Sequence, residues 1–131
     1  IIKKALLARR VAEAAKKAVK TVTVNTKTVS AKTLSGAIAK AGGSNKYVTA
    51  IVLGKNVKNI SKGAFKSFKS TKTLVVQAKK LTKKSVKGSL KGSKVKTVKV
   101  KVGSKKTNKK YVKKYKKIFT KKNAGRKARV K

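Results

Sequence analysis

The side chains with reactive potential in this sequence are mainly lysines and hydroxyl groups. Histidine and cysteine are absent, and Glu13 is the one acidic residue. Paired carboxylates, a Ser-His-Asp triad and a metal site therefore cannot be assembled within the chain. Serine–lysine neighbours remain, such as Lys84 with Ser85 and Lys94 with Ser93, but nothing in the sequence would orient them. We therefore predict that the protein is not an enzyme and uses no cofactor or metal.

Positive charge dominates the composition. Lysine and arginine supply 41 of the 131 residues, which gives a formal net charge of +40. A small domain needs a net charge of only about 2–8 to stay in solution. Most of the cations are lysines, which are hydrated point charges and do not fork onto base edges as arginine does. The composition thus predicts attraction to polyanions without preference for a base sequence: DNA, RNA, heparin-like glycans or anionic wall polymers. An anionic membrane surface is a further candidate partner, and we expect a monomer.

Four short segments that would position these lysines alternate like β-strands, with apolar residues two apart. The pairs are Val22/Val24, Ile51/Leu53, Leu74/Val76 and Val98/Val100, and a fifth pair is Ala128/Val130. In residues 98–102 the valines are predicted on one face and Lys99 and Lys101 on the other.

The spacing of these pairs predicts a repeated architecture. The intervals between their first residues are 29, 23, 24 and 30 residues. One strand every 20–30 residues is typical of a solenoid, in which neighbouring turns bury a shared core. We therefore expect an α/β fold with a small parallel sheet.

The connecting segments are predicted to be helices and turns. Ser30 should cap a helix that ends at Gly42-Gly43. The expected apolar face of this helix is Leu34, Ala37, Ile38 and Ala41. Ser61 should open a turn that carries Ala64, Phe65 and a partly buried Phe68, and the next turn carries Leu81, Val86 and Leu90.

A lysine-dense helix is predicted over residues 108–119. Its apolar residues have helical spacing: Tyr111, Val112, Tyr115, Ile118 and Phe119. The opposite face carries six lysines: Lys109, Lys110, Lys113, Lys114, Lys116 and Lys117. Together with Lys99 and Lys101, these six are the predicted polyanion-binding residues.

The first part of the chain has the pattern of an amphipathic helix. We expect residues 1–20 to cap the exposed end of the solenoid, and residues 21–131 to form the repeats, the lysine-rich helix and the last strand. A cationic helix lying on a membrane is the alternative for the first segment. Because the chain begins at Ile1 rather than Met, we expect that it is a processed or trimmed product.

Residues 48–65, VTAIVLGKNVKNISKGAF, resemble the BspA-like class of bacterial leucine-rich repeats. In that class a strand is followed by a polar loop, an Ile-Gly/Ser element, Ala-Phe and a second strand, for which residues 74–76 are available. Residues 81–93 and 111–119 are similar to the C-terminal repeats of lysine-rich surface proteins from gut Firmicutes. The resemblance implies a leucine-rich-repeat solenoid in a secreted or wall-attached protein with an interaction role.

Three departures from that family bear on its implications. Ser67-Phe68 stands where the family often has cysteine, proline is absent, and acidic residues are almost absent. The last departure raises an engineered, supercharged version as an alternative. Beside polyanion binding, two other functions stay open: a bacterial surface adhesion module, and a membrane-active or cell-penetrating carrier.

Overall fold

The computed structural model describes residues 18–131. Residues 1–17, and with them nearly all of the expected capping helix, lie outside the described part. The described residues form strands and helices in this order: β1 (Thr21–Val24), β2 (Thr28–Val29), α2 (Ala31–Lys40), β3 (Ala50–Leu53), β4 (Asn59–Ile60), β5 (Thr73–Val76), β6 (Thr97–Val100), α3 (Lys105–Lys116), α4 (Lys121–Ala124) and β7 (Arg129–Val130).

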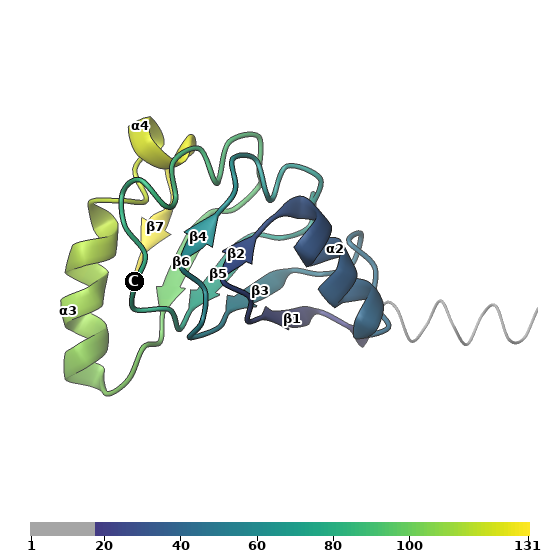
Figure 1. Ribbon diagram of the computed structural model, residues 1–131, viewed down its shortest axis with the longest axis horizontal. Coiled ribbons are helices and arrows are strands. Elements are labelled where there is room, and N and C mark those ends of the chain that lie inside the picture. Colours follow the sequence, from purple (N-terminus) through teal and green to yellow (C-terminus); the bar gives the residue numbers. More distant parts are fainter. Residues whose placement is uncertain (1–17) are drawn as a thin grey trace, which may run out of the picture.

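The centre of the fold is a five-stranded parallel sheet with the order β1-β3-β5-β6-β7. Strands β2 and β4 form a second, two-stranded parallel sheet. Figure 1 shows α2 beside β1 at one end of the large sheet and α3 beside β6 and β7 at the other. The predicted α/β class and the small parallel sheet are confirmed.

The register of the large sheet follows the predicted apolar pairs at four strands. Val22, Ile51, Leu74 and Val98 lie opposite one another across β1, β3, β5 and β6. The fifth apolar pair, Ala128/Val130, falls at the last strand, where Val130 is the residue that pairs with Val98. Ala128 precedes β7 and is only half-buried, whereas Val130 is buried. The larger valine side chain supplies the apolar contact at this position.

The inward side chains of the strands form one continuous core with the apolar residues of the turns. Phe65 and Phe68 are fully buried and pack edge to face, with ring centroids 6.5 Å apart. The expectation that Phe68 is only partly buried was wrong, because this turn places both rings in the core. Leu81, Val86 and Leu90 are buried as predicted.

Helix α2 begins and ends close to the predicted residues. The Ser30 side chain accepts a hydrogen bond from the Thr33 amide and caps the helix. The amides of Gly42 and Gly43 donate to the last carbonyls, which ends it. Leu34 and Ile38 are buried and Ala37 is half-buried. Ala41, expected on the buried face, is the exposed C-cap residue.

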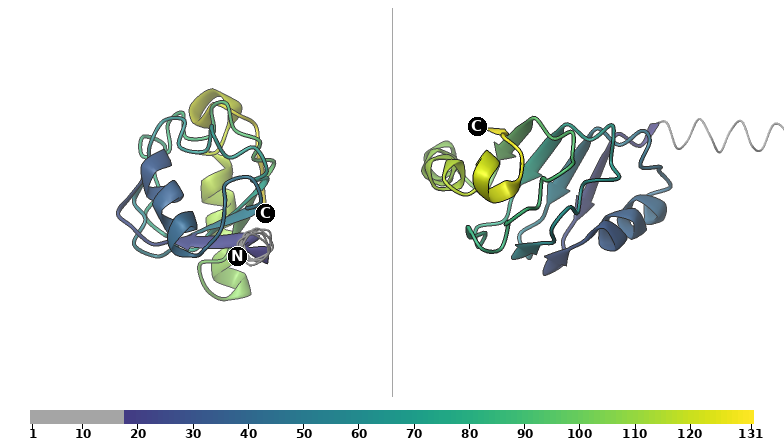
Figure 2. Two further views of the ribbon diagram at one scale, coloured as in Figure 1. Left: turned by 90° about the vertical axis from the view of Figure 1, so that its right-hand side faces the viewer. Right: turned by 90° about the horizontal axis from the view of Figure 1, so that it is seen from above.

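The turns on the other side of the core are joined by backbone hydrogen bonds between successive segments. The Gly63 amide donates to the Gly88 carbonyl at 2.9 Å, and the Gly88 amide donates to the Asn123 carbonyl at 2.7 Å. Figure 2 shows this side of the molecule from above, with α4 in yellow at its end. The turns that carry lysines are thus held against one another by the main chain.

We predict opposite effects for two glycine-to-alanine substitutions. Gly88 has a φ of +70°, and a Cβ there would lie 2.9 Å from Lys62 Cγ. Gly88→Ala should therefore lower the free energy of unfolding by about 1–2 kcal/mol. Gly36 lies within α2 and a Cβ there meets no atom within 4 Å. Gly36→Ala should raise the free energy of unfolding by roughly 0.5–1 kcal/mol. Urea denaturation of both variants measures the two effects, and equal signs would contradict the prediction.

Candidate functional site

Helix α3 carries five of the eight predicted binding residues, and Lys117 is its C-cap residue. The helix begins and ends three residues earlier than predicted. The Ser104 side chain accepts from the Thr107 amide and is the N-cap. The side chain of Asn108 accepts instead from the amides of Val102 and Gly103, at 2.8 and 2.9 Å. Asn108 therefore fixes the entry to the helix from inside its first turn. Residues 117–119 continue α3 as a turn.

The apolar side of this segment packs against the end of the sheet. Tyr115, Ile118 and Phe119 are buried, and Tyr111 and Val112 are half-buried. The Tyr115 hydroxyl donates to the Ala78 carbonyl, which ties α3 to the segment that follows β5. Because the predicted apolar face is turned inward, the lysines of α3 face solvent.

All six predicted lysines of this segment are exposed, as are Lys105 and Lys106 in its first turn. A hollow of about 680 Å³ lies between the side chains of six lysines: Lys106, Lys109, Lys110, Lys113, Lys114 and Lys117. Lys114 Nζ lies 5.5 Å from the centre of the Tyr111 ring, close enough for a cation–π contact. The first turn of α3 contains no acidic residue that would offset the cations there.

The other two predicted residues belong to β6 and its end. Lys99 is exposed between the buried Val98 and Val100, and Lys101 is exposed directly after the strand. The pairing of β6 with β7 adds two cations that the sequence analysis did not select, Arg129 and Lys131, both exposed. The alternation Ala128, Val130 was the signal that could have identified them.

No acidic side chain lies close to this surface from within the described residues. Residues 18–131 contain 33 lysines and two arginines, and every one of these lysines is exposed. Arg126 differs, since it is half-buried and its Nε donates to the Val95 carbonyl at 2.7 Å. The lysines are therefore available to an external anion, whereas Arg126 supports the fold.

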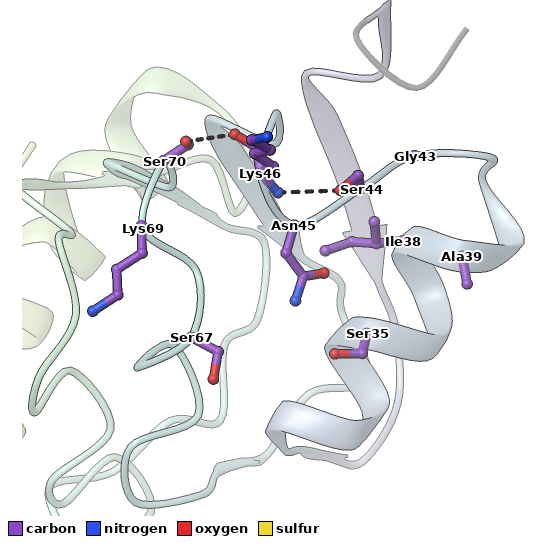
Figure 3. A pocket seen from close by; sticks show the side chains of 10 residues that line it. All are labelled: Ser35, Ile38, Ala39, Gly43, Ser44, Asn45, Lys46, Ser67, Lys69 and Ser70. Atoms are coloured by element: carbon purple, nitrogen blue, oxygen red, sulfur yellow. Dashed lines mark hydrogen bonds between the residues drawn. The ribbon is translucent and has the colours of Figure 1, made fainter. Parts of the chain in front are cut away.

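A hollow of about 540 Å³ at the other end of the molecule is lined mainly by small polar side chains. Figure 3 shows Asn45 projecting between Ser35 of α2 and Ser67 of the neighbouring turn. Ser70 donates to the Lys46 carbonyl at 2.6 Å, and Ser44 accepts from the Lys46 amide. These two hydroxyls hold the loop before β3, and residues 18–131 contain no acid or histidine that could activate them.

The two serine–lysine pairs considered above are also part of turns. Ser85 Oγ donates to the Thr82 carbonyl at 3.1 Å and accepts from the Thr82 amide at 2.8 Å. Ser93 is buried and accepts from the Val95 amide. Both hydroxyls are thus used in hydrogen bonds within their own turns, which explains them as turn residues.

Tyr115 makes the free energy of unfolding depend on pH in the alkaline range. Burial raises the pKa of its hydroxyl to about 12, above the usual value of about 10. Between pH 10 and 12 the unfolded chain loses this proton while the folded chain keeps it, so the free energy of unfolding falls as the pH rises. The wild type should therefore lose its advantage over Tyr115→Phe across this range. Denaturation of both proteins from pH 9 to 12 measures the difference, and because the two proteins differ only in this hydroxyl, the comparison isolates its contribution. A constant difference would contradict the assignment.

Comparison with protein-family models, with curated proteins and with solved structures found no match to this chain. Within residues 18–131 no helix is both long and apolar enough to cross a membrane. The same residues contain no group of three or more histidine, cysteine, aspartate or glutamate side chains that could hold a metal ion.

Proposed function

We propose that the protein is a non-enzymatic, leucine-rich-repeat-type solenoid that binds polyanions by charge. The observation that carries this proposal is the exposure of every lysine in residues 18–131, with no acidic residue among them. Uncompensated cations at this density repel one another and attract external anions. When lysines neutralise phosphates or sulfates, condensed counterions are released, and this release drives binding.

The proposed solenoid architecture is supported by the strand order and by the turns. Strands β1, β3, β5 and β6 have the same order in the chain as in the sheet. In the chain they are separated by β2, α2, β4 and connecting segments. The amides of Gly63 and Gly88 continue the same stacking on the opposite side of the core. Each segment thus contacts its neighbours, as the turns of a solenoid do.

A specific observation also supports the alternative of an adhesion module. The outward side chains of β1, β3 and β5 include no lysine; Thr23, Val52 and Val75 form one row across the three strands. Such an uncharged face could contact a protein partner. The membrane-active alternative depends chiefly on residues 1–17, which lie outside the described part.

A salt titration tests the proposed function. Duplex DNA and heparin should both bind the whole chain at low salt, and the plot of log affinity against log salt concentration should be linear. For duplex DNA the slope should be about −0.9 for each phosphate neutralised. Two DNA sequences of equal length should bind equally, since lysine carries no base code. Affinity that survives 1 M salt, or a strong sequence preference, would overturn charge-driven binding.

A further inference from the structure

Three lysine-lined hollows extend from α3 onto the turn side of the molecule. The first is the α3 hollow described above. The second, the junction hollow, has about 680 Å³ and lies where α3 and α4 meet the turn of residues 82–88. The third, the turn hollow, has about 510 Å³ and is lined by Lys62, Lys66 and Lys91 together with Gly63 and Gly92. The lysines of the α3 hollow come from successive turns of one helix. The lysines of the other two hollows come from segments that are distant in the sequence.

The first two hollows share a residue. Lys117 lines both the α3 hollow and the junction hollow, which also contains Lys83, Lys84, Lys87 and Lys122. Asn123 holds this junction together. Its side-chain amide donates to the carbonyls of Lys83 and Ile118, both at 2.8 Å. The turn of residues 82–88 is therefore fixed against the end of α3.

The junction hollow continues into the turn hollow through Gly88. Lys87 lines the junction hollow, and the next residue, Gly88, lies under the side chain of Lys62, which lines the turn hollow. Lys66 covers Gly92 in the same manner, with its Cγ 3.1 Å from the Cβ that alanine would add. The stems of both lysines thus rest on glycine backbone, so less side-chain freedom is lost when their ammonium groups bind an anion.

The path through the three hollows turns a corner. Figure 1 shows α3 along one end of the molecule and α4 at the top, so the path leaves the end and continues over the turn side. Duplex DNA has a persistence length of about 150 base pairs and stays straight over such a distance. A duplex would contact one part of the path, whereas a flexible single chain can follow all of it.

The side chains along the path also discriminate among flexible chains. None of the residues that line the three hollows is aromatic. Proteins that bind single-stranded nucleic acid gain much of their affinity from bases stacked on exposed aromatic rings. A ligand that presents only anionic groups and hydroxyls has no bases to stack, so the absence of aromatic rings does not lower its affinity.

We propose that the three hollows form one track for a linear sulfated glycan, whose sulfate and carboxylate groups pair with the lysines from Lys106 on α3 to Lys62 on the turn side. This inference rests on the proposed polyanion-binding function and adds to it a defined path and a partner. Lysines in the junction hollow carry the glycan around the corner, and Asn123 is a positioning residue.

A length series of heparin oligosaccharides tests the track. From Lys106 to Lys117 the helix axis covers about 16 Å, at 1.5 Å per residue. Affinity of the whole chain, measured by calorimetry at fixed salt, should keep rising for oligosaccharides well beyond this length. The triple variant Lys83→Gln, Lys84→Gln, Lys87→Gln should bind the longest oligosaccharide at least tenfold more weakly than the wild type does. Its affinity for the shortest oligosaccharide should be nearly unchanged. The matched control is Lys27→Gln, Lys32→Gln, Lys40→Gln, which removes the same charge from lysines that line none of the three hollows.

The outcomes separate this inference from the proposed function. If the control variant loses as much affinity for the long oligosaccharide as the junction variant does, net charge alone governs binding and the proposed track is refuted. A single-stranded RNA that binds more tightly than a glycan of equal charge would overturn the choice of partner. If the wild type binds neither heparin nor DNA at low salt, the proposed function itself fails. Circular dichroism of both triples establishes that each is folded.

Discussion

Leu74→Lys should leave the chain unfolded at neutral pH and low salt. Leu74 is fully buried in β5, between Ile51 of β3 and Val98 of β6. An unpaired ammonium group at this position would lose its hydration, and the described part of the chain has no acidic side chain to neutralise it. A penalty of about 3–5 kcal/mol is comparable with the whole stability of a small domain. Thermal and denaturant unfolding followed by circular dichroism measure the effect.

The adjacent residue supplies the matched control. Val75 belongs to the same strand but points outward, is half-buried, and lies opposite Lys99. Val75→Lys adds the same charge, yet its ammonium group can reach water, so the loss should stay within about 1 kcal/mol. Equal destabilisation by both variants would mean that added charge, rather than burial, sets the penalty.

Replacing the six predicted lysines of the α3 segment by glutamine should lower the affinity for polyanions by orders of magnitude at low salt. The six are Lys109, Lys110, Lys113, Lys114, Lys116 and Lys117, all exposed. With about −0.9 per phosphate contact, the log–log salt slope for duplex DNA should flatten by up to about 5. Because the apolar side of the segment is untouched, the fold should persist. Fluorescence anisotropy with labelled DNA across a salt series gives the slope.

A second six-fold variant separates location from net charge. Lysines in the first half of the described chain are equally exposed, and six of them can be replaced by glutamine: Lys27, Lys32, Lys40, Lys55, Lys58 and Lys69. This variant should flatten the slope much less than the α3 variant does. Identical slopes for the two variants would show that binding depends on the total charge and that α3 has no special place in it.

The strands were predictable because their burial pattern is local. In β6 the alternation of valine and lysine assigns one face to the core, and a shift by one residue would bury the lysines. The same argument placed Ile51, Leu74 and Val98 in one row, which the pairing of β3, β5 and β6 confirms. The two-residue strands β2 and β4 carry too short a pattern to be recognised.

The first residue of α3 could not be predicted from the sequence. Ser104 and Asn108 are both good N-cap residues, and sequence alone does not choose between them. The choice depends on the turn after β6, where the amides of Val102 and Gly103 need an acceptor and Asn108 supplies it. Once Asn108 is used in this way, Ser104 caps the helix.

The sequence by itself determined that this protein carries a high density of positive charge with one acidic residue to offset it. It also determined that the lysines lie outside a periodic apolar core. Charge and alternation are properties of neighbouring residues, so they need no coordinates. Only the tertiary structure decided which lysines from distant segments line the same hollow. The bond from Asn123 to Lys83 spans 40 residues, and the contact of Lys62 with Gly88 depends on how successive turns align. Such contacts arise from packing between distant segments, and no local pattern encodes them.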